Sequence, residues 1–210
     1  MDCPHCSQGQ WREFYSDYQM TVDEIGAVAS SGHRFKVVHI AGGEPTMWRE
    51  FESGCEFVKR SGLGKRIEVS SNCFDYPRII DALRHRRIDL VYCQVSNASA
   101  EGIAAIQAVF PDRLLVGRRR KVHKPLPKEP MAGVLPATCG CDRPAVFAGR
   151  VYQCADVYPN MVRLGLNSYI PKSFADVTDD WMKEIRAMDR FNHPACAVCL
   201  ANRKVWDRIP

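Results

Sequence analysis

Apolar positions follow two patterns in the part of the chain that ends near residue 124. Some short runs predict strands, and the first of them, 35–41, is β-branched and almost continuously apolar, which is typical of a strand buried in a parallel sheet. Others have apolar residues at helical spacing, and the first of these opens with Thr21 and Glu24, the two residues of a capping box. The expected strands are 35–41, 66–70, 88–96 and 113–122, and the expected helices are 21–31, 48–61, 77–86 and 99–109.

Strand and helix alternate here in units of roughly 25 to 30 residues, which predicts a parallel α/β sheet, either open or closed into a (β/α) barrel. In both architectures, ligands bind at the carboxyl ends of the strands. We therefore expect the functional residues at that edge. By this assignment the edge carries Cys3, Cys6, the turn 42–45, the segment 70–72 and Ser96.

The alternation stops near residue 124, and the chain then changes in character. Residues 125–137 are a proline-rich linker, which is stiff and non-helical. Residues 138–210 contain five cysteines among short segments, with one amphipathic helix expected at about 176–189. We therefore expect three parts: an α/β domain over 1–124, the linker, and a small cysteine-rich domain that a metal organises.

Composition narrows the class of protein. The chain is 46% hydrophobic and 25% charged, which is ordinary for a globular protein, and it contains no apolar run long enough for a membrane helix. The first residues lack the basic and apolar regions of a signal peptide, so we expect a cytoplasmic protein without a membrane partner. In a reducing compartment the ten cysteines favour metal or cluster binding over disulfides.

The net charge of +5 is mild, and much of the positive charge lies in the basic segment 118–124. Such a run is typical of a solvated surface or a local anion contact. It also leaves open a contact with nucleic acid.

Two motifs point to specific chemistry. The chain opens with Cys3-Pro4-His5-Cys6, and the expected strand 35–41 ends in the turn Gly42-Gly43-Glu44-Pro45. A CxxC alone is ambiguous between zinc, an iron–sulfur cluster and a redox dithiol. Together with the GGEP turn at a strand end, it resembles the radical S-adenosylmethionine (SAM) enzymes.

This resemblance implies a set of roles for residues at the expected edge. Cys3 and Cys6 would hold a 4Fe-4S cluster that leaves one iron open for SAM, and His5 would lie against the adenine. The GGE motif would contact the methionyl amine, while other polar residues would contact its carboxylate and the ribose. The residues implied for the cofactor are His5, Gly42, Gly43, Glu44, Pro45, Ser70, Ser71, Asn72 and Ser96.

The cluster loop of this family is CxxxCxxC, and its first cysteine would lie two residues upstream of Met1. The chain therefore supplies two of the three ligands. We expect it to be truncated at the N-terminus relative to the family, with the first barrel strand also missing and the barrel correspondingly partial.

The closing cysteines resemble a second element of the same family, the auxiliary-cluster extension called twitch, a shortened relative of SPASM. Cys139 and Cys154 flank an expected hairpin over 146–152, and Cys196 and Cys199 follow the expected helix. The resemblance implies an auxiliary 4Fe-4S cluster on these four cysteines. Cys141 is an alternative to Cys139, and a structural zinc site with four cysteines is an alternative to the cluster.

The resemblance implies a radical SAM enzyme that reductively cleaves SAM to a 5′-deoxyadenosyl radical and removes a hydrogen atom from a substrate. A peptide is one candidate substrate, and flavodoxin or ferredoxin is an expected electron donor. The alternative is a non-catalytic zinc or iron–sulfur protein that contacts nucleic acid through residues 118–124. We expect Cys55, Cys73 and Cys93 to be structural thiols, with a reactive role left open for Cys73 and Cys93.

Overall fold

The structure is a computed structural model, and it describes residues 18–94, 98–117, 121–123, 144–152, 174–178, 180–187 and 206–208. The described residues belong to two compact units. The first contains those from Gln19 to Lys121 together with Arg208, and the second contains Tyr18 and those from Val122 to Asp207.

The first unit is built on a parallel sheet with the strand order β1-β2-β3-β4. The strands are β1 (Phe35–Ile40), β2 (Gly64–Ser70), β3 (Leu90–Gln94) and β4 (Leu114–Gly117). Each strand pairs in parallel with the next one along the chain. The parallel α/β sheet expected from the sequence is therefore confirmed, and its carboxyl ends lie at one edge.

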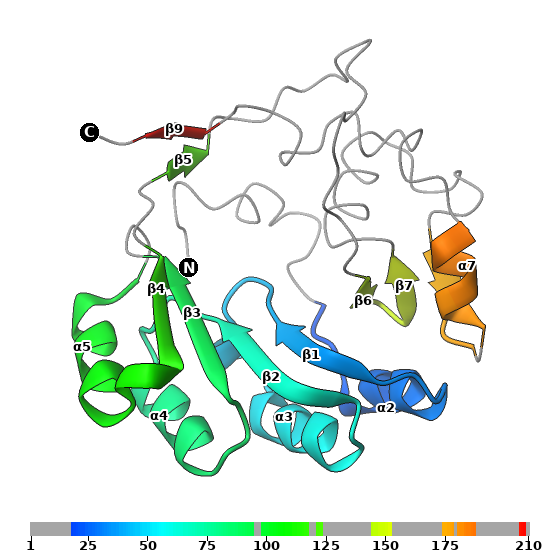
Figure 1. The fold of residues 1–210 in the computed structure, drawn as a ribbon, viewed down its shortest axis with the longest axis horizontal. Helices are drawn as coiled ribbons and strands as arrows, with labels where there is room; N and C mark the ends of the chain where they lie inside the picture. Colours follow the sequence, from blue (N-terminus) through cyan, green and yellow to red (C-terminus); the bar gives the residue numbers. More distant parts are fainter. Residues whose placement is uncertain are drawn as a thin grey trace. The chain divides into compact units, whose positions relative to one another are not determined.

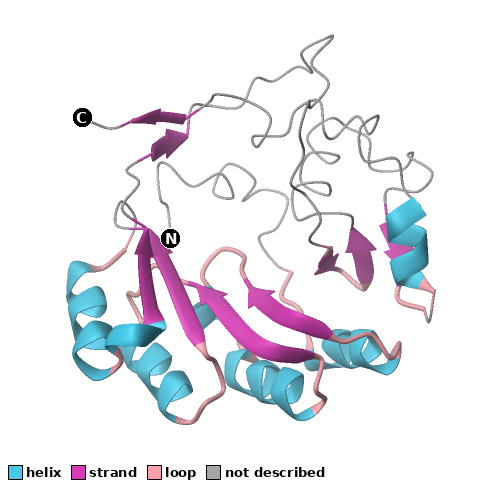
Figure 2. Cartoon of the chain, in the orientation of Figure 1, coloured by secondary structure: helices cyan, strands magenta, loops and turns pink. Residues whose placement is uncertain are grey.

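Helices connect consecutive strands and lie on one side of the sheet (Figures 1 and 2). The first, α2, begins after Thr21, and the expected capping box is present, because Thr21 and Glu24 exchange side-chain and backbone hydrogen bonds. The helices of this unit are α2 (Val22–Ser30), α3 (Phe51–Arg60), α4 (Tyr76–Arg84) and α5 (Ala100–Val109).

The core lies between the sheet and these helices. Ile67 and Val69 on β2 and Val91 on β3 are fully buried there. Residues that alternate with them point to the opposite face, so that face carries His39 and Glu68, which are paired across β1 and β2. The helix-covered face is thus apolar, whereas the opposite, helix-free face carries the polar residues of β2 and His39 beside apolar residues such as Val37 and Leu115.

Two short 3-10 helices were not expected, and they change the boundaries of neighbouring elements. Residues Pro45–Met47 form η2, so α3 begins at Phe51 rather than at residue 48. Residues Pro111–Arg113 form η3, and the single strand expected over 113–122 is two strands, β4 and the three-residue β5 (Lys121–His123). β5 pairs with β9 (Trp206–Arg208) in a separate sheet.

The second unit contains the hairpin expected over 146–152. Strands β6 (Ala145–Phe147) and β7 (Arg150–Tyr152) pair in an antiparallel manner around Ala148 and Gly149. Both turn residues have positive φ, at 50° and 69°, as a tight two-residue hairpin requires.

The helix expected over about 176–189 begins later than expected. Residues Phe174–Asp176 form β8, the third strand of the hairpin sheet, and α7 spans Trp181–Ala187. Trp181 and Ile185, one helical turn apart, are buried with Val151 of β7. Asp176, at the start of the expected helix, is therefore the last residue of a strand. Among the described residues, no helix has the length and apolar character needed to cross a membrane.

Two helical glycines give a matched test of this packing. A Cβ on Gly102 would lie 1.9 Å from the carbonyl oxygen of Cys73, whereas a Cβ on Gly26 would meet only the Phe57 ring, at 3.6 Å. We expect Gly102→Ala to lower the free energy of unfolding by about 1–3 kcal/mol through overpacking. Gly26→Ala is expected to be neutral or to stabilise by about 0.5–1 kcal/mol. Urea unfolding measures both, and equal effects of the two substitutions would contradict this account.

Candidate functional site

The GGEP turn follows β1 at the carboxyl edge of the sheet. Gly42 has a φ of +155°, an angle that side chains rarely adopt, and a Cβ on Gly42 or Gly43 would have no atom within 4 Å. Both glycines are exposed. The turn therefore presents bare backbone to open space, which is the arrangement that lets a ligand approach the main chain closely.

Glu44 follows these glycines, and its carboxylate is the centre of a hydrogen-bond cluster. Oε1 accepts hydrogen bonds from the Thr46 amide at 3.3 Å, the Thr46 hydroxyl at 2.9 Å and the Ser71 hydroxyl at 2.8 Å. Oε2 accepts one from the Asn72 amide at 2.8 Å. Thr46 is the middle residue of η2, and Ser71 and Asn72 continue from the end of β2. The carboxylate thus joins the end of β1 to the end of β2.

Three of these hydrogen bonds end on Oε1 and one on Oε2, so Oε2 keeps capacity to accept another. Glu44 is therefore a half-buried anion held in a fixed position by neutral donors. It can attract a cationic group at the turn by charge, while its hydrogen-bonding capacity holds the strand ends. The exposed backbone of Gly42 and Gly43 is left to make direct contact with a ligand.

A second polar group lies on the helix-free face next to this turn. Ser70, the last residue of β2, has its hydroxyl 2.8 Å from His39 Nε2. His39 Nδ1 lies 3.7 Å from Glu68 Oε2, and Arg66 forms an ion pair with the other oxygen of Glu68. The His39 ring also lies near that of Tyr92, with 5.8 Å between centroids. Ser70 is therefore engaged with the sheet face, whereas Ser71 and Asn72 are engaged with Glu44.

Three described cysteines are free thiols, and all three are buried, as expected for structural thiols. Burial raises the pKa of Cys55 from 9.0 to about 12. Cys73, in a left-handed conformation at a φ of 59°, follows the Glu44 cluster along the chain. A hydrogen bond between the thiols raises the pKa of Cys73 and lowers that of Cys93.

The structure brings together only some of the residues that the sequence suggested. The turn and the segment 70–72 meet as expected, because parallel strands end at one edge. Several candidates lie outside the described residues: Cys3, His5, Cys6, Ser96, Cys139, Cys141, Cys154, Cys196 and Cys199, together with most of the basic segment 118–124. Within the described ranges, no group of three or more His, Cys, Asp or Glu side chains is arranged to hold a metal ion.

Three residues at or beside this edge were not predicted from the sequence: Thr46, His39 and Glu68. Thr46 lies in a 3-10 turn of three residues, which is too short to give a periodic pattern. His39 and Glu68 did leave a signal, since each is a polar residue between two apolar residues of a strand. A polar residue at such a position requires either a polar partner or an open sheet face.

The model of the radical SAM superfamily matches residues 1–127, more than half of the chain. The chain belongs to the radical SAM superfamily. Membership implies a 4Fe-4S cluster, SAM and a reductant, and it supports an enzyme of the general radical SAM reaction class. The parallel four-stranded sheet is consistent with a partial radical SAM (β/α) fold. Comparison with curated proteins finds no match.

The residues of the described edge fit the methionyl part of SAM. The turn offers exposed backbone at Gly42 and Gly43 beside open space, and a fixed anion at Glu44. An ammonium group needs hydrogen-bond acceptors and is attracted by a nearby negative charge. The turn supplies both within four residues of the end of β1.

Glu44 gives a direct test of the cluster. Glu44→Gln removes the charge and replaces one acceptor oxygen by an amide NH₂, which leaves donors at the end of β2 without a partner. We expect the free energy of unfolding to fall by about 1–3 kcal/mol. The matched control is Glu56→Gln, which removes a half-exposed ion pair with Arg87 and is expected to cost at most about 1 kcal/mol. Urea unfolding measures the free energy of unfolding of both variants. Equal decreases in the two variants would show that Glu44 does not hold the strand ends together.

The raised pKa of Cys55 makes the free energy of unfolding depend on pH in the alkaline range. Its folded pKa of about 12 lies above the ordinary 9.0, so the unfolded chain loses this proton first as pH rises. Stability from this thiol is complete below pH 9 and is lost between pH 9 and 12, by up to about 1.4 kcal/mol per pH unit. Cys55→Ala removes this contribution, so its deficit relative to the parent chain should shrink from pH 8 to pH 10. Parallel stability curves would contradict the assignment.

Proposed function

We propose that this protein reductively cleaves SAM at the carboxyl edge of the β1–β4 sheet and removes a hydrogen atom from a substrate bound beside it. The observation that carries the proposal is the Glu44 cluster, which holds the GGEP turn against the end of β2. The cluster lies in the part of the chain matched by the superfamily model.

The proposal assigns roles to residues on both sides of this edge. Cys3 and Cys6 hold the 4Fe-4S cluster, and His5 lies against the adenine. The Gly42 and Gly43 backbone binds the methionyl amine, Glu44 fixes the turn and attracts that amine, and Pro45 begins the 3-10 turn. The resemblance also assigns Ser70, Ser71, Asn72 and Ser96 to the cofactor surface, and Ser96 keeps that role in the proposal. The bound cluster and SAM supply one-electron cleavage to a 5′-deoxyadenosyl radical.

Two of the candidate cofactor residues, Ser71 and Asn72, are proposed to support SAM binding indirectly. Ser71 and Asn72 already donate to Glu44, so their contribution to SAM binding is to hold the turn. Ser70 instead faces His39 on the polar sheet face. That face, with His39, Glu68 and Ser70, is the surface we assign to the substrate side of the reaction.

We extend the proposal to an auxiliary 4Fe-4S cluster on Cys139, Cys154, Cys196 and Cys199, with Cys141 as the alternative to Cys139. Two described elements support it. The β6–β7 hairpin turns at Ala148 and Gly149, between the first two cysteines, and α7 precedes the final pair along the chain. Four thiolates from separated segments would stabilise a unit whose described apolar core is small.

A peptide or protein is the proposed substrate class, because the described sheet is open. It has four strands in sequential order, with β1 and β4 at its edges, and its polar face carries the exposed His39. An open sheet admits a longer chain than a closed barrel does. A crystal complex with a small substrate fully enclosed by protein would contradict this assignment.

The decisive experiment is anaerobic reconstitution of the chain with iron and sulfide, followed by reduction with dithionite in the presence of SAM. We expect a brown protein that produces 5′-deoxyadenosine, measured by liquid chromatography and mass spectrometry. Cys6→Ala should abolish the product. In a parallel form, a cysteine is added two residues before Met1, at the position of the first ligand of the family's CxxxCxxC loop, and the same product is expected.

Two controls make this result interpretable. Cys55→Ala, which alters a fully buried thiol of α3 that is not among the proposed cluster ligands, should retain 5′-deoxyadenosine formation. Colourless protein containing only zinc, in both forms of the chain, would overturn the proposal. That outcome, together with nucleic-acid binding that weakens steeply with salt, would instead favour the non-catalytic alternative.

A further inference from the structure

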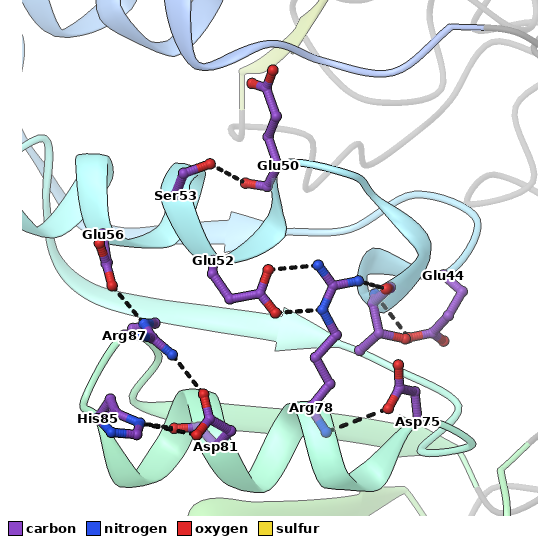
Figure 3. A network of polar contacts seen from close by, with 11 residues as sticks. Glu44, Glu50, Glu52, Ser53, Glu56, Asp75, Arg78, Asp81, His85 and Arg87 are labelled. Atoms are coloured by element: carbon purple, nitrogen blue, oxygen red, sulfur yellow. Dashed lines mark hydrogen bonds and ion pairs between the residues drawn. The ribbon is translucent and has the colours of Figure 1, made fainter.

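Arg78 connects three segments of the chain behind the GGEP turn. It lies in the first turn of α4, and its guanidinium forms a two-pronged ion pair with Glu52 in the first turn of α3 (Figure 3). Nε bonds to one oxygen of Glu52, and Nη2 donates to the other at 2.5 Å. The remaining nitrogen, Nη1, donates to the carbonyl oxygen of Thr46. Arg78 thus bridges two helices and η2.

Thr46 is the link between Arg78 and Glu44. Its carbonyl oxygen accepts from Arg78, while its amide and hydroxyl both donate to the Glu44 carboxylate. The Thr46 residue is only 2% exposed, so these groups have little access to water. A displacement of Thr46 would therefore move the donors that position Glu44, and through Glu44 the turn that carries Gly42 and Gly43.

The orientation of Arg78 is fixed from several sides. The guanidinium lies 5.4 Å from the centre of the Phe51 ring, which is fully buried. The backbone amide of Arg78 donates to the Asp75 side chain, which caps α4. The hydrogen bond with Arg78 lowers the pKa of Glu52 and raises that of Arg78, so both groups stay charged at neutral pH.

The geometry needs arginine in particular. A guanidinium presents its donors as a planar fork, so it can hold both oxygens of Glu52 and still direct Nη1 to a third group. A lysine ammonium keeps the charge and can pair with Glu52, but it cannot reproduce this fixed three-way contact. Arg78→Lys therefore keeps the positive charge at this position and removes the fixed arrangement of its hydrogen bonds.

We propose that Arg78 is a positioning residue for SAM binding: through Thr46 it holds the GGEP turn in the shape that receives the methionyl group. The proposal rests on the proposed function of the turn. Arg78 itself does not touch the cofactor in this account. Its effect reaches the cofactor through the backbone of Thr46 and the carboxylate of Glu44.

The same pair of helices contains a matched control. Arg87 follows α4 and forms ion pairs with Glu56 of α3 and with Asp81 of α4 (Figure 3). Its side chain is 21% exposed, close to the 26% of Arg78. Both arginines therefore link α3 to α4 at similar exposure, but only Arg78 is bonded to Thr46 among the described contacts.

The experiment compares Arg78→Lys with Arg87→Lys in the anaerobically reconstituted full chain. The probe is SAM itself, and its dissociation constant is measured by equilibrium dialysis. We expect binding to weaken about tenfold in Arg78→Lys, the effect of losing one charge-assisted hydrogen bond, and less than about twofold in Arg87→Lys. Glu52→Gln weakens the ion pair while leaving Arg78 itself unchanged, and its dissociation constant for SAM should lie between those of the two lysine variants. The dissociation constant of Glu56→Gln should match that of Arg87→Lys.

Urea unfolding of all four variants separates positioning from general stability. The proposal expects similar unfolding midpoints for Arg78→Lys and Arg87→Lys but different SAM affinities. In 5′-deoxyadenosine formation, the KM for SAM should rise in Arg78→Lys with kcat changed less than about twofold. Equal SAM affinities in the two lysine variants would overturn the positioning role while leaving the proposed function intact. Absence of SAM binding by the parent chain would overturn the proposed function itself.

Discussion

The carboxylate of Glu44 is the interaction on which the edge of the sheet depends. Adjacent parallel strands share hydrogen bonds along their length, but the chain leaves the ladder where the strands end, and the segments beyond need other partners. Glu44 supplies them: one side chain from the end of β1 satisfies donors from η2 and from the end of β2. The two glycines before Glu44 can therefore stay exposed, because the neighbouring backbone and hydroxyl donors already have a partner in its carboxylate.

In a radical SAM protein, the edge that Glu44 organises is where we assign SAM, and the two faces of the sheet beside it differ in character. The helices α3, α4 and α5 bury the apolar side chains of β2 and β3 on one face. The opposite face keeps a histidine, a glutamate and an arginine that interact with one another. Those polar groups are costly inside a protein unless they are paired. Here they are paired across neighbouring strands, next to the turn that we assign to SAM.

The sequence was sufficient for the parallel sheet and for the meeting of the GGEP turn with Ser71 and Asn72, because apolar runs and helical spacing report directly on burial. It was not sufficient for η2 or for the role of Arg78. A 3-10 turn of three residues is too short for periodicity, and Arg78 looks like an ordinary charged residue in the first turn of an amphipathic helix. Its function depends on Thr46, 32 residues earlier in the chain, which no local pattern reveals. β8 was not predicted at all for the same reason, since its partner is β7.

The alternation along β2 has a consequence for how this protein can change. Ile67 and Val69 are locked into the core, whereas Glu68 and Ser70 stand between them on the other face. Evolution or design can therefore alter the chemistry of the polar face one residue at a time without repacking the helices. The sheet separates the positions that maintain the fold from the positions that can be varied to suit a different reactant.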